Sequence, residues 1–169
     1  MAHRSNESEL IRLLYYSAFS KDFPRSEVAQ DAEIADIIHV SARNNQARSI
    51  TGLLLVHQHY FIQALEGPSQ AVMASYQRIA ADRRHKGATM MTVGKAVRSF
   101  SQWNMCARRL GDADDEILRT LDLKGCFQPQ SVSPSKTLNL LKIIAATISV
   151  RRLGQESAIP DLRRQIQSA

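Results

Sequence analysis

Hydrophobic and polar positions along the chain form short runs that predict strands. Apolar, β-rich runs at Leu10–Tyr16, Ile50–Val56 and Tyr60–Leu65 predict three strands. The last two are separated only by His57-Gln58-His59, which favours an antiparallel hairpin, although this turn lacks the usual glycine. Two later runs, Thr89–Val97 and Trp103–Leu110, predict two more strands.

Two segments between these runs have apolar residues at helical spacing. The first starts at Ser26, a suitable N-cap, and is expected to end near Asn44-Asn45. The second covers Ser69–Asp82, and the basic residues 83–86 with Gly87 predict its end. The order βαββαββ predicts an α+β, ferredoxin-like, mainly antiparallel sheet with two helices on one face.

The opposite sheet face needs a cover, and the tail of the chain can supply it. Asp112–Leu121 predicts a short acidic helix, and Pro134–Arg152 predicts a longer one. The longer helix has an apolar stripe made by Leu138, Leu141, Ile144, Ala145 and Ile148. Such a stripe packs either on the bare sheet face or on another subunit.

Composition and charge exclude some classes of protein. The longest apolar run, residues 143–150, is far shorter than the roughly 20 residues that span a bilayer, and no secretion signal is visible. The two cysteines form no CxxC pair, which argues against a disulfide framework or a zinc site and favours a reducing cytoplasm. The net charge of +6 is scattered along the chain, without a helix-turn-helix or an aromatic RNA-binding strand, so we expect a solvated basic surface.

Polar residues within apolar elements are the candidates for chemistry, because a buried polar group must be hydrogen-bonded. Tyr15 in the first strand and Gln63 in the third would meet on the helix-covered face, and Asn44-Asn45 offers a second amide pair. Taken singly, these residues are weak signals, because a strand tyrosine or glutamine is usually a partly exposed, hydrogen-bonded side chain and Asn-Asn usually marks a helix stop. His57 and His59 lack a third metal ligand, so no metal is expected.

No catalytic constellation accompanies these residues. Glu66 is a possible general base, but it closes a strand and has no nucleophile or second carboxylate beside it. We therefore expect that the chain is not an enzyme.

Five linked motifs resemble the BLUF family of flavin-based blue-light sensors. They occur in the order and spacing of that family between about Leu10 and Leu110, and their combination is specific where each alone is not. The motifs are LIRLLYYS, NNQARSITGLLL, YFIQALEGP, YQRIAADRRH and RSFSQWNM.

The resemblance implies FAD as a noncovalent cofactor, with the flavin ring between the two helices. Ile37 and Ile79 are then expected against the ring faces, and Asn44 and Asn45 at its polar edge. The residues expected at the far carbonyl side are Arg84 with Arg78, Asp82 and His85.

The resemblance also implies a photoactive pair, Tyr15 and Gln63. In this family light drives an electron and a proton from the tyrosine, the glutamine rearranges, and a new hydrogen bond to the flavin gives a small red shift. An amide has a donor end and an acceptor end, so turning it changes what its neighbour receives. Trp103 and Met105 match the last-strand pair that passes the signal on, although such residues also commonly serve as core.

The expected organisation is a disordered N-terminal extension (1–9), a flavin-binding sensor domain (10–110), a C-terminal helical extension (111–153) and a flexible tail (154–169). We expect signalling to a separate regulatory or effector protein, with a homo-oligomer formed through the C-terminal helices, no membrane association and no nucleic acid. The alternatives are a light-independent, ferredoxin-like module for another ligand or protein, and a nucleic-acid binder suggested by charge alone. A yellow colour on purification would separate the first interpretation from both.

Overall fold

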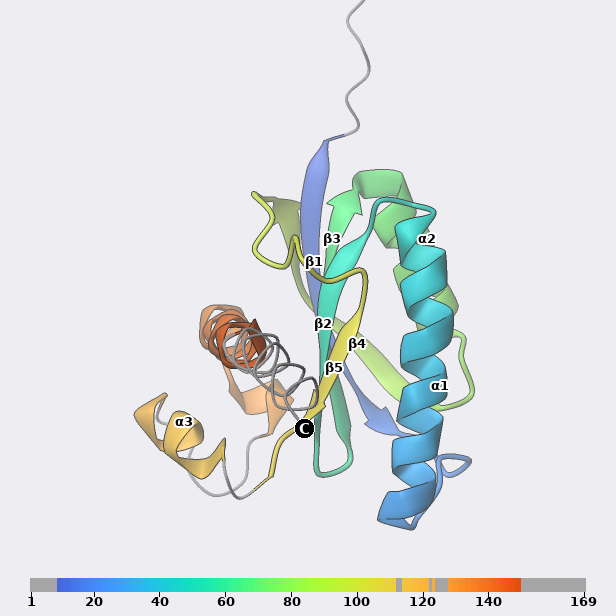
Figure 1. The fold of residues 1–169 in the computed structure, drawn as a ribbon, viewed down its shortest axis with the longest axis vertical. Helices are drawn as coiled ribbons and strands as arrows, with labels where there is room; N and C mark the ends of the chain where they lie inside the picture. The colour runs from blue at the N-terminus through green and yellow to red at the C-terminus, as the bar shows by residue number, and fades with distance from the viewer. Residues whose placement is uncertain (1–8, 112–113, 122, 124–127, 150–169) are drawn as a thin grey trace, which may run out of the picture.

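Five strands form one sheet in the order β4-β1-β3-β2-β5 (Figure 1). The computed structural model describes residues 9–111, 114–121, 123 and 128–149. Its strands are β1 (Leu10–Phe19), β2 (Thr51–His57), β3 (Tyr60–Pro68), β4 (His85–Lys95) and β5 (Cys106–Arg109). Its helical segments are α1 (Glu27–Gln46), α2 (Ser69–Ala80), α3 (Asp115–Thr120), the 3-10 turn Pro129–Ser131 and a helix over residues 134–149.

The sheet has the predicted ferredoxin-like arrangement with one added strand. β1 pairs antiparallel with β3 and β4, β2 pairs antiparallel with β3, and β5 adds parallel to β2 at the edge. The β2–β3 hairpin turns without glycine because Gln58 itself takes a positive φ of 51°. The predicted α+β fold class is therefore confirmed.

Strand alternation divides the side chains of β1 between two cores. Leu13 and Tyr15 belong to the core under α2, whereas Leu14 and Tyr16 belong to the core on the opposite sheet face. This places Tyr15 beside the helices and its neighbour Tyr16 on the other side of the sheet.

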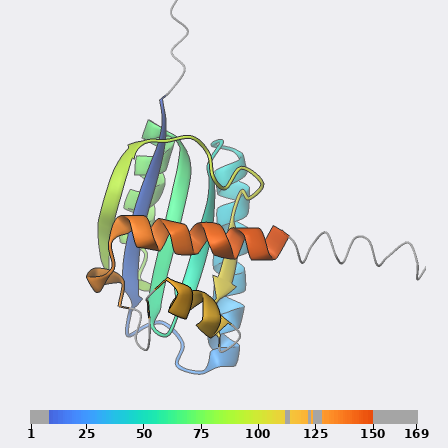
Figure 2. The ribbon, with the colours of Figure 1, turned by 90° about the vertical axis from the view of Figure 1, so that its left-hand side faces the viewer.

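The helix over residues 134–149 lies across the sheet face opposite α1 and α2 (Figure 2). Leu140, Leu141 and Ile144 are fully buried there, and Leu138 and Ile148 pack at the margin. Of the two partners expected for this apolar stripe, the structure shows the chain's own sheet. The predicted disordered extension (1–9) and flexible tail (154–169) lie outside the described residues, except for residue 9.

Several predicted boundaries were wrong by a few residues. The second helix ends at Ala80, because Asp82 and the following residues form a turn in which the Arg84 backbone N–H donates to the Asp82 carboxylate (2.9 Å). β4 then begins at His85 instead of Thr89, since His85 already pairs with Phe19 of β1. β5 begins at Cys106, so Trp103 precedes the strand.

Within the described ranges, no helix is both long and apolar enough to cross a membrane.

Candidate functional site

The core on the α1 and α2 side of the sheet is split into two clusters. One lies under α2 and contains Tyr15, Leu65 and Val72, and the other lies under α1 and contains Ile37 and Phe61. A cavity of about 170 Å³ opens between the two helices. Its lining residues are Val40, Ser41, Asn44, Asn45, Ser75, Arg78, Ile79, Asp82 and Arg84.

Helical spacing brings these side chains to the cavity. Ser41 and Asn45 are four residues apart on α1, and Ser75 and Ile79 are four apart on α2, so each pair shares one helix face. Ile37 lies one turn before Ser41 and is buried against the sheet.

Tyr15 and Gln63 meet on the same sheet face, where Tyr15 belongs to the cluster that the cavity residue Ile79 packs against. They are paired residues in the β1–β3 register, and the Tyr15 hydroxyl donates to Gln63 Oε1 at 2.5 Å. Both side chains are buried, with exposures of 1% and 4%. Burial, with smaller contributions from Tyr76 and Asp82, raises the pKa of Tyr15, so the phenol remains protonated at neutral pH.

The other end of the Gln63 amide points to β5. Its Nε2 donates to Met105 Sδ at 3.1 Å, and Met105 contacts the clusters under both helices. A thioether is a weak acceptor, so the amide is held firmly at its oxygen and weakly at its nitrogen.

Trp103 does not share this side. It is buried in the core under the C-terminal helix, on the opposite sheet face from Met105. Residues two apart face the same side only when both lie in a strand. Trp103 lies in the loop before β5, so this rule does not apply to it. The expected signalling pair is therefore divided between the two faces.

Arg84 and Asp82 form a charged group at one end of the cavity. The Arg84 guanidinium contacts Asp82 (Nη2 to Oδ2, 2.6 Å) and also Glu33 (3.0 Å) and Asp36 (3.3 Å) of α1. Burial acts to raise the pKa of Asp82, but hydrogen bonds and charge from Arg84 outweigh it and hold that pKa below its usual value. Both side chains are therefore charged at neutral pH.

His85 lies next to this group and is held neutral. Its Nδ1 is 2.7 Å from the Ser17 hydroxyl, and its ring packs on Phe61 with centroids 4.6 Å apart. Burial lowers the pKa of His85 to about 4, against an opposing effect of Asp82. His85 therefore offers a neutral imidazole beside the charged pair.

Asn45 is buried at the other end, and its Nδ2 donates to the Asn104 carbonyl at 2.8 Å. Asn44 and Arg78 line the cavity nearer its surface. The structure thus brings Asn44, Asn45, Arg78, Asp82 and Arg84 to one cavity, with Ile79 among them and with Ile37, His85 and the Tyr15–Gln63 pair around it.

The chemistry of this donor set suits a flavin ring. Aliphatic side chains from both helices can contact flat apolar faces, while amides, hydroxyls and a guanidinium can bind carbonyl and N–H groups at a ring edge.

The sequence interpretation missed four residues near the site: Ser41, Ser75, Glu33 and Asp36. Helical spacing from Ile37 and Ile79 could have identified the two serines, because each lies four residues from one of these isoleucines. Nothing in the sequence indicated that the two acids pair with Arg84. Among the described residues, no group of three or more His, Cys, Asp or Glu side chains is placed to hold a metal ion.

Curated relatives match parts of longer proteins. The photoactivated adenylate cyclase subunit alpha of Euglena gracilis is 28% identical over 102 residues, which is 60% of this chain and 10% of the cyclase subunit. The blue light- and temperature-regulated antirepressor BluF of Escherichia coli (strain K12) is 29% identical over 136 residues, which is 79% of this chain and 32% of BluF. The chain thus spans about a tenth to a third of these relatives.

Two solved structures match over nearly their full length. The dark-state structure of BlrB, a BLUF protein, has a TM-score of 0.64 and 28% identity, covering 83% of this chain and 98% of BlrB. The photo-activated state of BlsA has a TM-score of 0.70 at 21% identity, covering 80% and 94%, and supports the fold alone.

A family model described as sensors of blue-light using FAD matches residues 10–106, more than half of the chain. With the helix-flanked cavity and the buried Tyr15–Gln63 pair in place, the chain belongs to the BLUF family of blue-light sensors, whose cofactor is FAD.

Proposed function

We propose that this chain senses blue light through the hydrogen bonds of Tyr15 and Gln63 and signals to a separate partner protein. The observation that carries the proposal is the buried bond from the Tyr15 hydroxyl to Gln63 Oε1. A phenol and an amide with little exposure exchange hydrogen bonds only with each other and with their immediate neighbours. Such a pair responds to events at one place, the cavity between α1 and α2.

The arrangement of Gln63 favours rearrangement of its amide. The firm bond is at Oε1, whereas Nε2 meets only the weakly accepting Met105 sulfur at 3.1 Å. When bound, FAD supplies the absorption of blue light and the oxidising power for the photochemistry. Tyr15, a protonated phenol at neutral pH, can release its proton along the bond to Gln63 as it loses an electron. Turning or tautomerising the amide then exchanges the positions of its donor and its acceptor.

The cavity residues would hold the cofactor by their chemical type. We assign the ring faces to Ile37 and Ile79, and the polar edge to Asn44 and Asn45. Arg84 would serve the far carbonyl side. Asp82 orients the Arg84 guanidinium through a 2.6 Å contact, and Arg78 and His85 flank it.

The output is proposed to act on another protein in trans and not through catalysis by this chain. The part of the chain that matches the family model is the sensor alone, and the Euglena relative carries a cyclase name over a length that this chain covers by a tenth. The E. coli relative is named as an antirepressor, which supports a regulatory protein as partner. Cytoplasmic location and a homo-oligomer remain predictions. Because Leu141 and Ile144 are buried against the chain's own sheet, an oligomer formed through the C-terminal helix would use the outer face of that helix.

The test is the absorption spectrum of the protein loaded with FAD, in the dark and just after blue light, for wild type and Gln63→Leu. We expect a reversible red shift in the wild type and none in Gln63→Leu, because leucine has neither a donor nor an acceptor to exchange. Gln77→Leu, an exposed position on α2, is the matched control and should shift as wild type does. A colourless wild-type protein that also refuses added FAD would leave the light-independent module as the better account.

A further inference from the structure

Glu66 is a wholly buried carboxylate that the photochemical scheme leaves without a role. It lies near the end of β3, three residues after Gln63, and has an exposure of 0%. Its oxygens accept from Arg12 Nε at 2.7 Å, from the Ser99 backbone N–H at 2.8 Å and from the Phe100 backbone N–H at 3.0 Å. The carboxylate therefore ties the β4–β5 loop to the sheet.

Arg98 fastens the same loop at a second place. Its Nη1 donates to the Thr51 hydroxyl (2.7 Å) and the Glu66 carbonyl (3.0 Å), and its Nη2 donates to the Ser49 carbonyl (2.6 Å). Hydrogen bonds that involve a charged group are about twice as strong as neutral ones. We call Glu66, Arg98 and their bonds to this loop the loop clasp.

The clasped loop carries residues that face both sides of the sheet. Met105 lies on the flavin side against Gln63, and Trp103 is buried under the C-terminal helix. The Trp103 carbonyl also accepts from the Gly52 backbone N–H at 2.9 Å. Any displacement of the loop at Met105 therefore also moves Trp103, two residues away.

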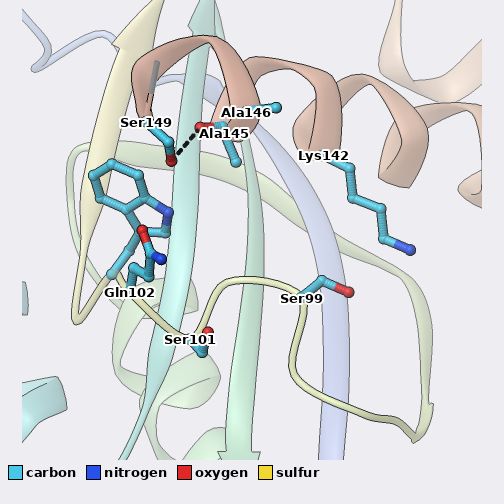
Figure 3. A pocket seen from close by; sticks show the side chains of 8 residues that line it. Ser99, Ser101, Gln102, Lys142, Ala145, Ala146 and Ser149 are labelled. Atoms are coloured by element: carbon cyan, nitrogen blue, oxygen red, sulfur yellow. Dashed lines mark hydrogen bonds between the residues drawn. The ribbon is translucent and has the colours of Figure 1, made fainter. Parts of the chain in front are cut away.

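The opposite side of this loop borders a space. A cavity of about 240 Å³ lies between the loop and the C-terminal helix. Figure 3 shows the side chains that line it, among them Ser99, Ser101 and Gln102 of the loop. Its helix wall is lined by three small residues, Ala145, Ala146 and Ser149, and by the longer Lys142. The loop is thus held on its sheet side by the clasp, and it has room to move on its helix side.

We propose that Glu66 is a positioning residue of the light response, which couples the change at Gln63 to the packing of Trp103 against the C-terminal helix. The inference rests on the proposed function, since it needs a light-driven change at Gln63. When residues 98–100 are held in place, a displacement of Met105 is passed along the rest of the loop to Trp103. Without the loop clasp, the whole loop shifts into the cavity instead, and the displacement does not reach Trp103.

Trp103 is the only tryptophan of the chain and so provides a direct readout. The experiment incorporates 5-fluorotryptophan into the full-length, FAD-loaded protein and records the fluorine NMR resonance in the dark and under blue light. The flavin absorption of each sample is recorded alongside. In wild type, we expect light to displace the Trp103 resonance as the flavin shifts to the red.

In Glu66→Gln, an amide N–H₂ replaces one acceptor oxygen against three donors. We expect the red shift to persist while the displacement of the resonance is strongly reduced, because the loop has lost an acceptor oxygen that holds it to the sheet. Lys95→Gln, which removes an exposed ion pair with Glu9 before the same loop, should respond as wild type does. If Glu66→Gln fails to fold, Arg98→Gln removes the second part of the clasp and should reduce the displacement in the same way.

A full displacement of the Trp103 resonance in the clasp variant would overturn the proposal. So would loss of the red shift together with the displacement, because Glu66 would then act on the flavin cavity itself. Failure of the proposed function gives a different result, namely a wild-type protein whose flavin spectrum does not respond to light.

Discussion

At the scale of single residues, the fold buries a polar pair that must satisfy itself. Tyr15 and Gln63 stand opposite each other on β1 and β3, so that each supplies the partner that the other loses on burial. An unpaired hydroxyl or amide in this position would cost about 1 to 3 kcal/mol. The pair is stable as a ground state because both groups are paired, and it can respond because the Met105 contact is weak.

His85 predicts an acid-dependent loss of stability. Its pKa is about 4 in the fold and about 6.5 when unfolded, so between these values the unfolded state binds more protons and stability falls as pH falls. Lowering the pH from 7.5 to 5 should cost about 1 to 2 kcal/mol through this residue. Burial lowers the pKa of His57 too, which adds to the slope in the same direction.

Urea unfolding at the two pH values measures this effect. His85→Gln should unfold with a smaller loss of stability between pH 7.5 and 5 than wild type. An unchanged loss in the variant would show that His85 titrates alike in both states.

The sequence identified the residues of the site better than it identified the sheet face on which each one lies. Tyr15, Gln63, Asn45 and Arg84 could be named because their motifs are local in the chain. The placement of Trp103 could not, since it depends on where β5 begins, and three residues of loop turn Trp103 to the opposite face from the one that strand alternation assigns. The pairing of Glu33 and Asp36 with Arg84 depends on tertiary distances across the cavity.

At the scale of elements, the close approach of β2 to β3 depends on Gly52. A Cβ added there would lie 2.2 Å from the Ala64 carbonyl oxygen, so the strands would have to shift. We expect Gly52→Ala to lower the free energy of unfolding by about 1 to 3 kcal/mol. Gly94→Ala is the matched control on β4, where no atom lies within 4 Å of the added Cβ.

Chemical denaturation of the two glycine variants checks this prediction. Gly94→Ala should stay within about 0.5 kcal/mol of wild type. Equal stability of both variants would mean that β2 and β3 can move apart at this point without a loss of stability.

Element existence followed from periodicity, whereas element ends followed from pairing. The predicted N-cap of α1 holds because the Ser26 hydroxyl accepts from the Ala29 backbone N–H. The predicted end of α2 was two residues too late. The Asp82 carboxylate accepts from the Arg84 backbone N–H and forms a turn there, and the sequence Asp-Arg-Arg does not distinguish such a turn from the last turn of a helix. β5 was predicted too long because only four of its residues meet β2.

At the scale of the whole molecule, the C-terminal helix completes the fold by covering the second sheet face. Leu141 is fully buried in this core, so Leu141→Ala should cost about 2 to 5 kcal/mol of unfolding free energy. Asn139→Ala, an exposed position of the same helix, should cost almost nothing. Urea unfolding of both variants measures the difference, and equal costs would contradict the packing of the helix on the sheet.

This covering was predicted from the apolar stripe, for which the chain's own sheet and another subunit were both considered as partners. Sequence periodicity fixes which residues of a helix face inward, yet it cannot tell the chain's own sheet from another subunit. The arrangement of Leu14, Leu53 and Ile62 on the opposite sheet face makes the choice, because these residues would otherwise be exposed.

Light-minus-dark absorption spectra of Tyr15→Phe and Tyr16→Phe, both loaded with FAD, test whether Tyr15 is the photoactive tyrosine. Tyr15 bonds Gln63 under α2, while Tyr16 packs on the other sheet face, so the two variants remove the same group from adjacent positions. The account predicts that Tyr15→Phe binds FAD and loses the red shift, whereas Tyr16→Phe keeps it. A red shift of wild-type size in Tyr15→Phe would contradict the account.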